Sequence, residues 1–142
     1  MERLQGLTIE DLEVGQAAEF TKTISESDVY GFAGITGDFN PVHVDRVAAE
    51  ASRFGGRIAH GMLTASLIST VIGMKLPGPG CIYMAQSLRF TAPVRFGDTV
   101  TARAEVAEVN REKNRVTLAT RCVNQDGDVV AEGESLVMPR KA

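Results

Sequence analysis

The feature that most constrains this chain is a long stretch without a charged side chain, residues 58–74. Its apolar residues fall on nearly every side of a helix, so a helix here needs cover all round from the rest of the chain. The stretch barely reaches the roughly 17 to 25 residues of a membrane-spanning helix, and it contains His60 and several hydroxyl side chains. It therefore predicts a buried central helix and no membrane partner. The helix is expected to run to about Leu76, where the Pro-Gly-Pro-Gly sequence of residues 77–80 stops it.

The second half of the chain offers the cover that this helix needs. Its apolar and polar residues alternate with a period of two, which is typical of strands with one buried face. Turn-forming residues separate the segments, and Asp126-Gly127 is a strong hairpin signal. The pattern predicts four consecutive antiparallel strands, at residues 82–90, 100–109, 115–124 and 129–138.

The first half predicts one more strand and two short helices. A weak alternation marks a strand at residues 14–22, after an irregular segment at residues 1–13. A capping-box pattern begins at Ser25 and opens a helix at residues 26–35. An alanine-rich stretch predicts a second helix at residues 44–52.

Together these elements predict a single α+β domain over residues 1–142, in which one antiparallel sheet curls around one apolar helix. The chain length is close to the common size of a domain. Such a sheet has an edge strand with unpaired backbone groups, which a second copy of the chain could cover. A homodimer is therefore the expected oligomer.

The net charge, the cysteines and the N-terminal residues indicate which partners and which cellular compartment to expect. The formal net charge of −3 gives no electrostatic reason to expect a nucleic-acid partner. The two cysteines, Cys81 and Cys122, have neither the spacing of a metal site nor the number of a disulfide framework. They are expected to be reduced and to pack as small apolar residues. The acidic N-terminal residues include no apolar signal segment, so a cytoplasmic protein is expected.

Residues 36–43, with the sequence TGDFNPVH, hold the first candidate chemistry. The glycine permits a sharp bend and the proline biases the residue before it away from helical backbone, so a loop is expected. Asp38 and His43 can act as an acid/base pair if both reach the same water molecule. The alternative is structural: Asp38 and Asn40 form turn hydrogen bonds, and His43 is a partly buried polar residue.

A longer set of motifs closely resembles one protein family. The motifs are YGFAGITGDFNPVH at residues 30–43, FGGRIAHGML at 54–63, SLRF at 87–90 and PVRFGD at 93–98. They resemble the MaoC-like (R)-specific enoyl-CoA hydratases, and the similarity covers nearly the whole chain from about Val14. The resemblance implies the hot-dog fold, in which a curved antiparallel sheet wraps a long central helix. This agrees with the pattern of elements described above.

The resemblance also implies a reaction and the groups that perform it. Family members add water reversibly across the double bond of a trans-2-enoyl-CoA and give an (R)-3-hydroxyacyl-CoA. Their catalytic Asp and His match Asp38 and His43, and the backbone amide that binds the thioester oxygen matches Gly61. The substrate is an acyl-CoA, and no metal or other cofactor is expected. Because this chain has the length of one hot-dog unit, the resemblance again implies a homodimer, with one Asp/His pair in each subunit.

Other residues near these motifs are candidates for contacts with the substrate: Asn40, His60, Met62, Ser66, Ser69 and Ile72. Asn40 is expected to hold the loop through backbone bonds. His60 is the rival for the imidazole role, but a role in ordering the start of the helix or lining the substrate entry is favoured. The serines have the alternative of bonding back to their own helix, and Ile72 that of plain core packing.

Several alternatives stay open at this point. Hot-dog folds also serve acyl-CoA thioesterases and 3-hydroxyacyl-carrier-protein dehydratases, and a non-catalytic acyl-CoA-binding subunit would use the same architecture. The CoA phosphates have four candidate partners, each equally suited to a solvated surface: Arg53, Arg57, Arg89 and Arg95.

Overall fold

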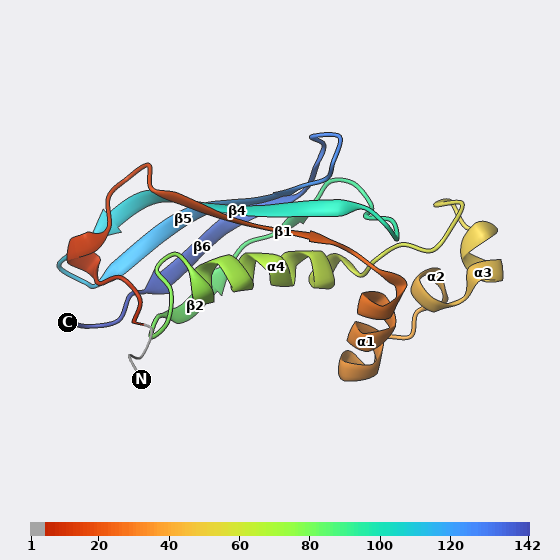
Figure 1. Ribbon diagram of the computed structural model, residues 1–142, viewed down its shortest axis with the longest axis horizontal. Coiled ribbons are helices and arrows are strands. Elements are labelled where there is room, and N and C mark those ends of the chain that lie inside the picture. The colour runs from red at the N-terminus through yellow and green to blue at the C-terminus, as the bar shows by residue number, and fades with distance from the viewer. Residues whose placement is uncertain (1–4) are drawn as a thin grey trace.

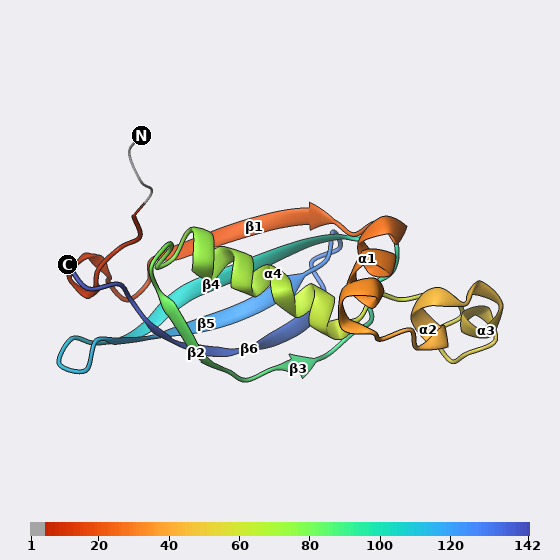
Figure 2. The same ribbon diagram turned by 90° about the horizontal axis from the view of Figure 1, so that it is seen from below.

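The computed structural model describes residues 5–142. One antiparallel sheet forms a curved layer, and the long helix α4 lies along its inner face (Figure 1, Figure 2). The strands follow the order β1-β4-β5-β6-β2, and β3 also pairs with β6. This is the α+β arrangement that the sequence predicts. The strand bounds are Ala17–Thr23 (β1), Ile82–Gln86 (β2), Arg89–Phe90 (β3), Thr99–Asn110 (β4), Arg115–Val123 (β5) and Val129–Met138 (β6).

The core lies between α4, Gly61–Met74, and the inner face of the sheet. In β4 and β5 the buried residues alternate with more exposed ones, because successive side chains of a strand point to opposite faces. The helix contributes four buried aliphatic side chains to this core, Leu67, Ile68, Val71 and Ile72. Within residues 5–142, none of the helices has the length and apolarity that crossing a membrane requires.

Both cysteines are free thiols, as the sequence predicts. Cys122 is fully buried in the core, and this burial raises the pKa of its thiol to about 12. Burial also raises the pKa of the half-buried Cys81 thiol. Both groups therefore stay protonated at neutral pH and pack as small apolar residues.

Three short helices stand together at one end of the sheet (Figure 1). The first of them begins with the predicted capping box, in which Ser25 and Asp28 bond each other's backbone N–H. It ends at Gly37, whose φ of +82° is a left-handed conformation that a side chain would oppose. The helix bounds are Glu26–Thr36 (α1), Pro41–Val44 (α2) and Arg46–Glu50 (α3).

The structure corrects two predictions in this region. His43 lies in a helical turn instead of a loop, because Pro41 occupies the first position of α2, where a missing N–H costs nothing. Asn40 caps that turn by accepting a backbone N–H at 3.2 Å. The predicted helix at residues 44–52 is shorter, since Asp45 leaves the helical conformation and caps α3 instead.

The single strand expected at residues 82–90 is divided into β2 and β3. The register of β2 against β6 shifts between Tyr83 and Ala85. Farther on, the carbonyl of Ser87 passes so close to Gly133 that a Cβ there would lie 1.8 Å from its oxygen. The division therefore needs the close backbone approach that only a glycine on β6 allows.

The N-terminal segment is more ordered than the irregular stretch expected at residues 1–13, of which residues 1–4 lie outside the described part. A 3₁₀ turn, η1, forms at Ile9–Asp11. Thr8 forms a bridge with Arg140, and Leu12 is fully buried in the core. These contacts lie at the end of the sheet opposite α1–α3 (Figure 1).

The helix α4 is not covered on all sides in the single chain, which corrects the prediction of an all-round wrapping. Met62 and Met74 are 57% and 63% exposed, and Ser66 and Ser69 are exposed on the same open side. Figure 2 looks onto this side, where α4 lies in front of the sheet. The neighbouring edge of the sheet also exposes large apolar side chains, Ile82, Met84 and Phe90.

Candidate active site

The site is built at the point where α1, α2 and the start of α4 meet. Asp38 follows α1, and the turn at Gly37 directs the chain back toward α2. The carboxylate of Asp38 is exposed, and its Oδ1 accepts the backbone N–H of Asn40 at 3.2 Å. A capped helix end therefore presents a carboxylate that solvent reaches.

His43 is buried, and a backbone contact determines which of its nitrogens carries the proton. Its Nδ1 donates to the carbonyl oxygen of Ile58 at 2.8 Å. Because a carbonyl can only accept, the neutral ring carries its proton on Nδ1. Its Nε2 is then left as a free acceptor for a proton or a hydrogen bond.

His60 lies against His43 and connects it to the Asp38 loop. The two imidazole rings are stacked, with centroids 3.8 Å apart. His60 Nε2 donates to the backbone carbonyl of Asp38 at 2.9 Å, and the ring of Phe32 packs 4.8 Å away. The side chain is only 2% exposed, and its Nδ1 has no partner within residues 5–142. His60 therefore supports both the Asp38 loop and the imidazole of His43.

The three side chains converge. Each of Asp38, His43 and His60 has a side-chain oxygen or nitrogen atom within 4.8 Å of those of the other two. A carboxylate beside a free imidazole nitrogen can bind one water molecule between them and exchange protons with it. A carboxylate and two imidazoles at this spacing also form a donor set that a divalent cation could use.

Gly61 is the first residue of α4 and directly follows His60. The N–H groups of a first helical turn have no partner within the helix, and the helix dipole adds positive potential there. A Cβ on Gly61 would lie 2.9 Å from the ring of Phe90, so this position has no room for a side chain unless that ring moves. The start of α4 can therefore present a backbone N–H to a negatively charged oxygen.

A cavity of about 470 Å³ opens beside Gly61, between the start of α4 and the segment around β3. Its lining is mainly apolar, with Thr64 on the helix side and Arg53 among the lining residues. The sequence-predicted residues Gly61 and Met62 also line it. A cavity of this size and character fits part of a small organic ligand.

The remaining sequence-predicted residues are placed differently. Asn40 caps α2, and Ser66 bonds back to its own helix at Leu63 O, 2.5 Å away. Ser69 and Ile72 lie roughly 12 to 16 Å along the helix axis from Gly61. The structure brings Asp38, His43, His60, Gly61 and Met62 to one end of the molecule and leaves Ser69 and Ile72 farther along α4.

A further contact network supports α2 and is not evident from the sequence. Tyr30 on α1 donates its hydroxyl hydrogen to the carbonyl of Val44 at 2.8 Å, and it accepts from Arg57 at 2.8 Å. Arg57 also forms an ion pair with Glu26 at 2.6 Å, which raises the pKa of its guanidinium. Arg57 is thus engaged within the protein, which disfavours it as a partner for CoA phosphates. Tyr30 and Arg57 both stand in the sequence motifs, but the contacts between them depend on the fold.

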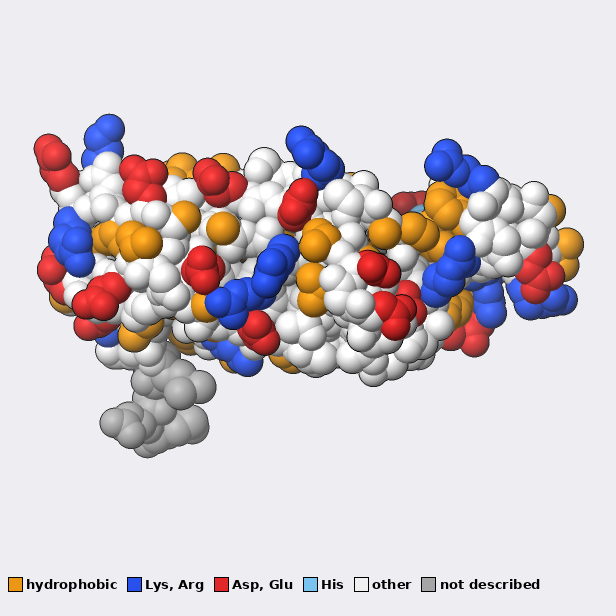
Figure 3. Space-filling model, turned by 90° about the horizontal axis from the view of Figure 1, so that it is seen from above, with side chains coloured by type: hydrophobic (Ala, Val, Ile, Leu, Met, Phe, Trp, Pro, Cys, Tyr) orange, Lys and Arg blue, Asp and Glu red, His pale blue; other side chains and the backbone are white. Residues whose placement is uncertain are grey.

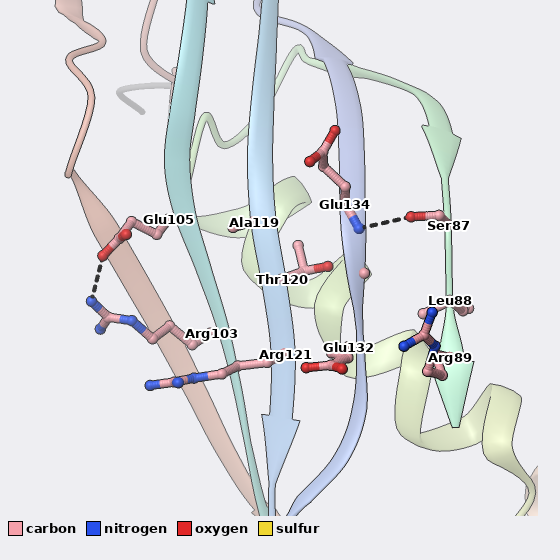
Figure 4. Close-up of a pocket in the computed structure, with 11 residues that line it drawn as sticks. Ser87, Leu88, Arg89, Arg103, Glu105, Ala119, Thr120, Arg121, Glu132 and Glu134 are labelled. Atoms are coloured by element: carbon pink, nitrogen blue, oxygen red, sulfur yellow. Dashed lines mark hydrogen bonds and ion pairs between the residues drawn. The ribbon is translucent and has the colours of Figure 1, made fainter. Parts of the chain in front are cut away.

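A larger hollow of about 650 Å³ lies on the outer face of the sheet (Figure 4). The outer face carries scattered acidic and basic side chains (Figure 3), and Arg103 is paired there with Glu19 and Glu105. None of the sequence-predicted catalytic residues lines this hollow, so it is separate from the candidate site. Its charged lining residues are Arg89, Arg103, Glu105, Arg121, Glu132 and Glu134.

Comparisons with known proteins agree with this geometry. A model of the family described as "MaoC like domain" matches residues 11–126. The chain is 55% identical over 129 residues to an (R)-specific enoyl-CoA hydratase of Rhodospirillum rubrum, covering 91% of this chain and 89% of the relative. It is 52% identical over 139 residues to a 3-hydroxybutyryl-CoA dehydratase of Methylorubrum extorquens, covering 97% and 88% of the two chains.

A solved structure shows the same fold. The unliganded R-hydratase PhaJ1 of Pseudomonas aeruginosa superimposes with a TM-score of 0.91 at 49% sequence identity. The match covers 97% of this chain and 89% of that one. The hot-dog fold that the sequence motifs imply is thereby confirmed.

Proposed function

This chain belongs to the MaoC-like domain family, and we propose that it is an (R)-specific enoyl-CoA hydratase. It adds water reversibly to a trans-2-enoyl-CoA and gives an (R)-3-hydroxyacyl-CoA. The observation that carries this function is the identity of more than half of the aligned residues with such a hydratase over nine-tenths of the chain. Its substrate is therefore an acyl-CoA.

Asp38 and His43 are proposed to activate the water. Water is a poor nucleophile, so it must be oriented toward carbon 3 and lose a proton as it attacks. The Asp38 carboxylate and the free His43 Nε2 both accept hydrogen bonds, so a water between them has its oxygen lone pair directed outward. Asp38 takes one proton from the water as its oxygen bonds to carbon 3, the proton passes within the pair to His43 Nε2, and His43 returns it to carbon 2. Both additions then occur on the same face of the double bond, which fixes the stereochemistry.

Gly61 is proposed to stabilise the negative charge that develops on the thioester oxygen. Its N–H belongs to the first turn of α4, where the helix dipole favours an anion. A preorganised donor of this kind contributes about 2.7 to 4 kcal/mol to transition-state stabilisation in well-studied enzymes. His60 is proposed to position Asp38 and His43 without transferring a proton itself, since its Nε2 is engaged by the Asp38 carbonyl.

The assay that tests this function follows the conjugated double bond of crotonyl-CoA. We expect its ultraviolet absorbance to fall on addition of the protein, with (R)-3-hydroxybutyryl-CoA as the product on chiral chromatography. A thiol-reactive dye is expected to stay uncoloured, because hydration leaves the thioester intact. Activity is expected to persist in EDTA, since water activation by Asp38 and His43 needs no cation. Release of free CoA, the (S) product, or loss of activity in EDTA would contradict the proposal.

We also propose that two copies of the chain associate through the open side of α4 and the exposed edge at β2. An edge strand leaves backbone groups unpaired, and the exposed apolar residues there include Met62, Met74 and Met84. Light scattering after gel filtration is expected to give twice the chain mass of 15.2 kDa. Met84→Arg is expected to shift the protein toward the single-chain mass. A wild-type protein that elutes with the mass of one chain would refute the dimer.

The compartment stays a prediction. Both thiols are free and shielded, which suits the reducing cytoplasm that the sequence predicts.

A further inference from the structure

Thr64 carries a buried polar atom that the fold leaves without a partner. The residue is 2% exposed, and no group within the described part of the chain bonds its Oγ1. A threonine on a helix ordinarily donates to the carbonyl four residues earlier, which here is that of His60. That carbonyl already accepts the N–H groups of Leu63 at 3.0 Å and Thr64 at 3.3 Å, so both of its lone pairs are used. The Thr64 hydroxyl thus has no partner within the described residues, and a buried polar group without one is costly.

The place of this hydroxyl indicates what its partner is. Thr64 lines the cavity beside Gly61, in an otherwise mainly apolar wall that includes Phe90 and Val130. Gly61 and Thr64 are three residues apart on α4, so they are neighbours on the helix surface, about 5–6 Å apart. A ligand whose carbonyl oxygen is bound at Gly61 would have atoms a few bonds farther along within reach of the Thr64 hydroxyl.

We propose that Thr64 binds the amide nearest the thioester in the pantetheine arm of the substrate. This inference rests on the proposed hydratase function and on the thioester oxygen lying at Gly61. An unsubstituted enoyl chain offers no hydrogen-bonding atom to a buried hydroxyl, whereas the thiol arm carries an amide only a few bonds beyond the thioester. The cavity would therefore take the thiol side of the substrate, and the acyl chain would lie elsewhere.

The lining residue Arg53 agrees with this orientation. Its side chain is exposed and its guanidinium lies over the ring of Phe54, 5.4 Å from the centroid. A pantetheine arm that leaves the cavity past Arg53 would bring a phosphate to a guanidinium, which binds phosphate well. Both CoA and acyl carrier protein supply the same phosphopantetheine arm, so the Thr64 contact is common to the two sources.

The test compares thiol arms while the crotonyl group stays constant. The substrates are crotonyl-CoA, crotonyl-N-acetylcysteamine, which keeps the inner amide, and S-ethyl thiocrotonate, which has none. Thr64→Val is isosteric and removes only the hydroxyl. We expect it to raise KM for the two amide-bearing substrates, relative to S-ethyl thiocrotonate, by roughly three- to tenfold, the value of one neutral hydrogen bond. Thr64→Ser keeps a hydroxyl and is expected to recover most of that difference.

Thermal unfolding of the same variants separates binding from structure. Because the hydroxyl has no partner in the free protein, Thr64→Val is expected to melt at or above the wild-type temperature. An equal change of KM on all three substrates, or a lower melting temperature without substrate discrimination, would overturn the inference. If the wild type hydrates none of the three, the proposed function fails instead. Crotonyl-CoA and crotonyl-acyl carrier protein, compared on the wild type by kcat/KM, identify the natural source of the arm.

Discussion

Asp38→Asn is expected to lower kcat for hydration of crotonyl-CoA by about 10²- to 10⁴-fold, the usual contribution of a general base. The amide has nearly the same shape as the carboxylate, but it cannot accept a proton from water. Its oxygen can still accept the Asn40 N–H that Asp38 Oδ1 accepts in the wild type, so the loop is expected to keep its conformation. Initial rates from the enoyl absorbance, with circular dichroism on the same samples, check both parts of the expectation.

A matched control exists in the same segment. Asp45 also caps a short helix, accepting the Ala48 N–H at 3.0 Å, but it is not among the converging side chains. Asp45→Asn changes charge by the same amount and is expected to leave kcat within about twofold, because surface changes of this kind cost little. Near-normal activity of Asp38→Asn, or an equal loss in the Asp45 variant, would refute the assignment of Asp38 as the base.

His43→Gln is expected to reduce kcat by a comparable factor, about 10²- to 10⁴-fold. Glutamine can still donate one hydrogen bond, as His43 Nδ1 does to the Ile58 carbonyl. It offers no basic nitrogen in place of Nε2, so the proton that must reach carbon 2 has no carrier. Rates at saturating crotonyl-CoA measure this loss, and thermal unfolding shows whether the buried position tolerates the change.

His60→Gln gives the comparison that assigns the two imidazoles. It loses the ring stack with His43 and disturbs the bond to the Asp38 carbonyl, so some misalignment of the pair is expected. Misalignment costs less than removal of the proton carrier, and the loss of kcat is expected to be the smaller of the two. If His60→Gln proves more damaging at equal folded content, the roles of the two histidines must be exchanged.

Much of the fold can be predicted from the sequence, because the hydrophobic periodicity and the turn-forming residues determine local structure. The uncharged stretch at residues 58–74 predicts α4, and alternation in the second half predicts the strands that pair around it. The corrections arise where tertiary contacts decide. The strand expected at residues 82–90 is divided where the Ser87 carbonyl closely approaches Gly133, a residue far away in the sequence.

The candidate site is predictable in its members but not in their arrangement. Asp38, His43 and Gly61 stand in motifs that resemble a known family, so their types and positions are visible in the sequence. The stack of His60 on His43 is not, since it depends on where α2 meets the start of α4. The unpartnered hydroxyl of Thr64 is not visible in the sequence either. Threonine hydroxyls on apolar helices usually bond to a carbonyl of their own helix, and in the structure this one does not.

The imidazoles of His43 and His60 donate to main-chain oxygens, those of Ile58 and Asp38 respectively. Every amino acid carries the same peptide oxygen, so residue 58 can be exchanged while the tautomer of His43 is preserved. An insertion that displaced the backbone there would be far more harmful than any exchange of side chain. The position of the proton on His43 thus depends on the path of the backbone at residue 58, and exchange of the side chain there is not expected to change it.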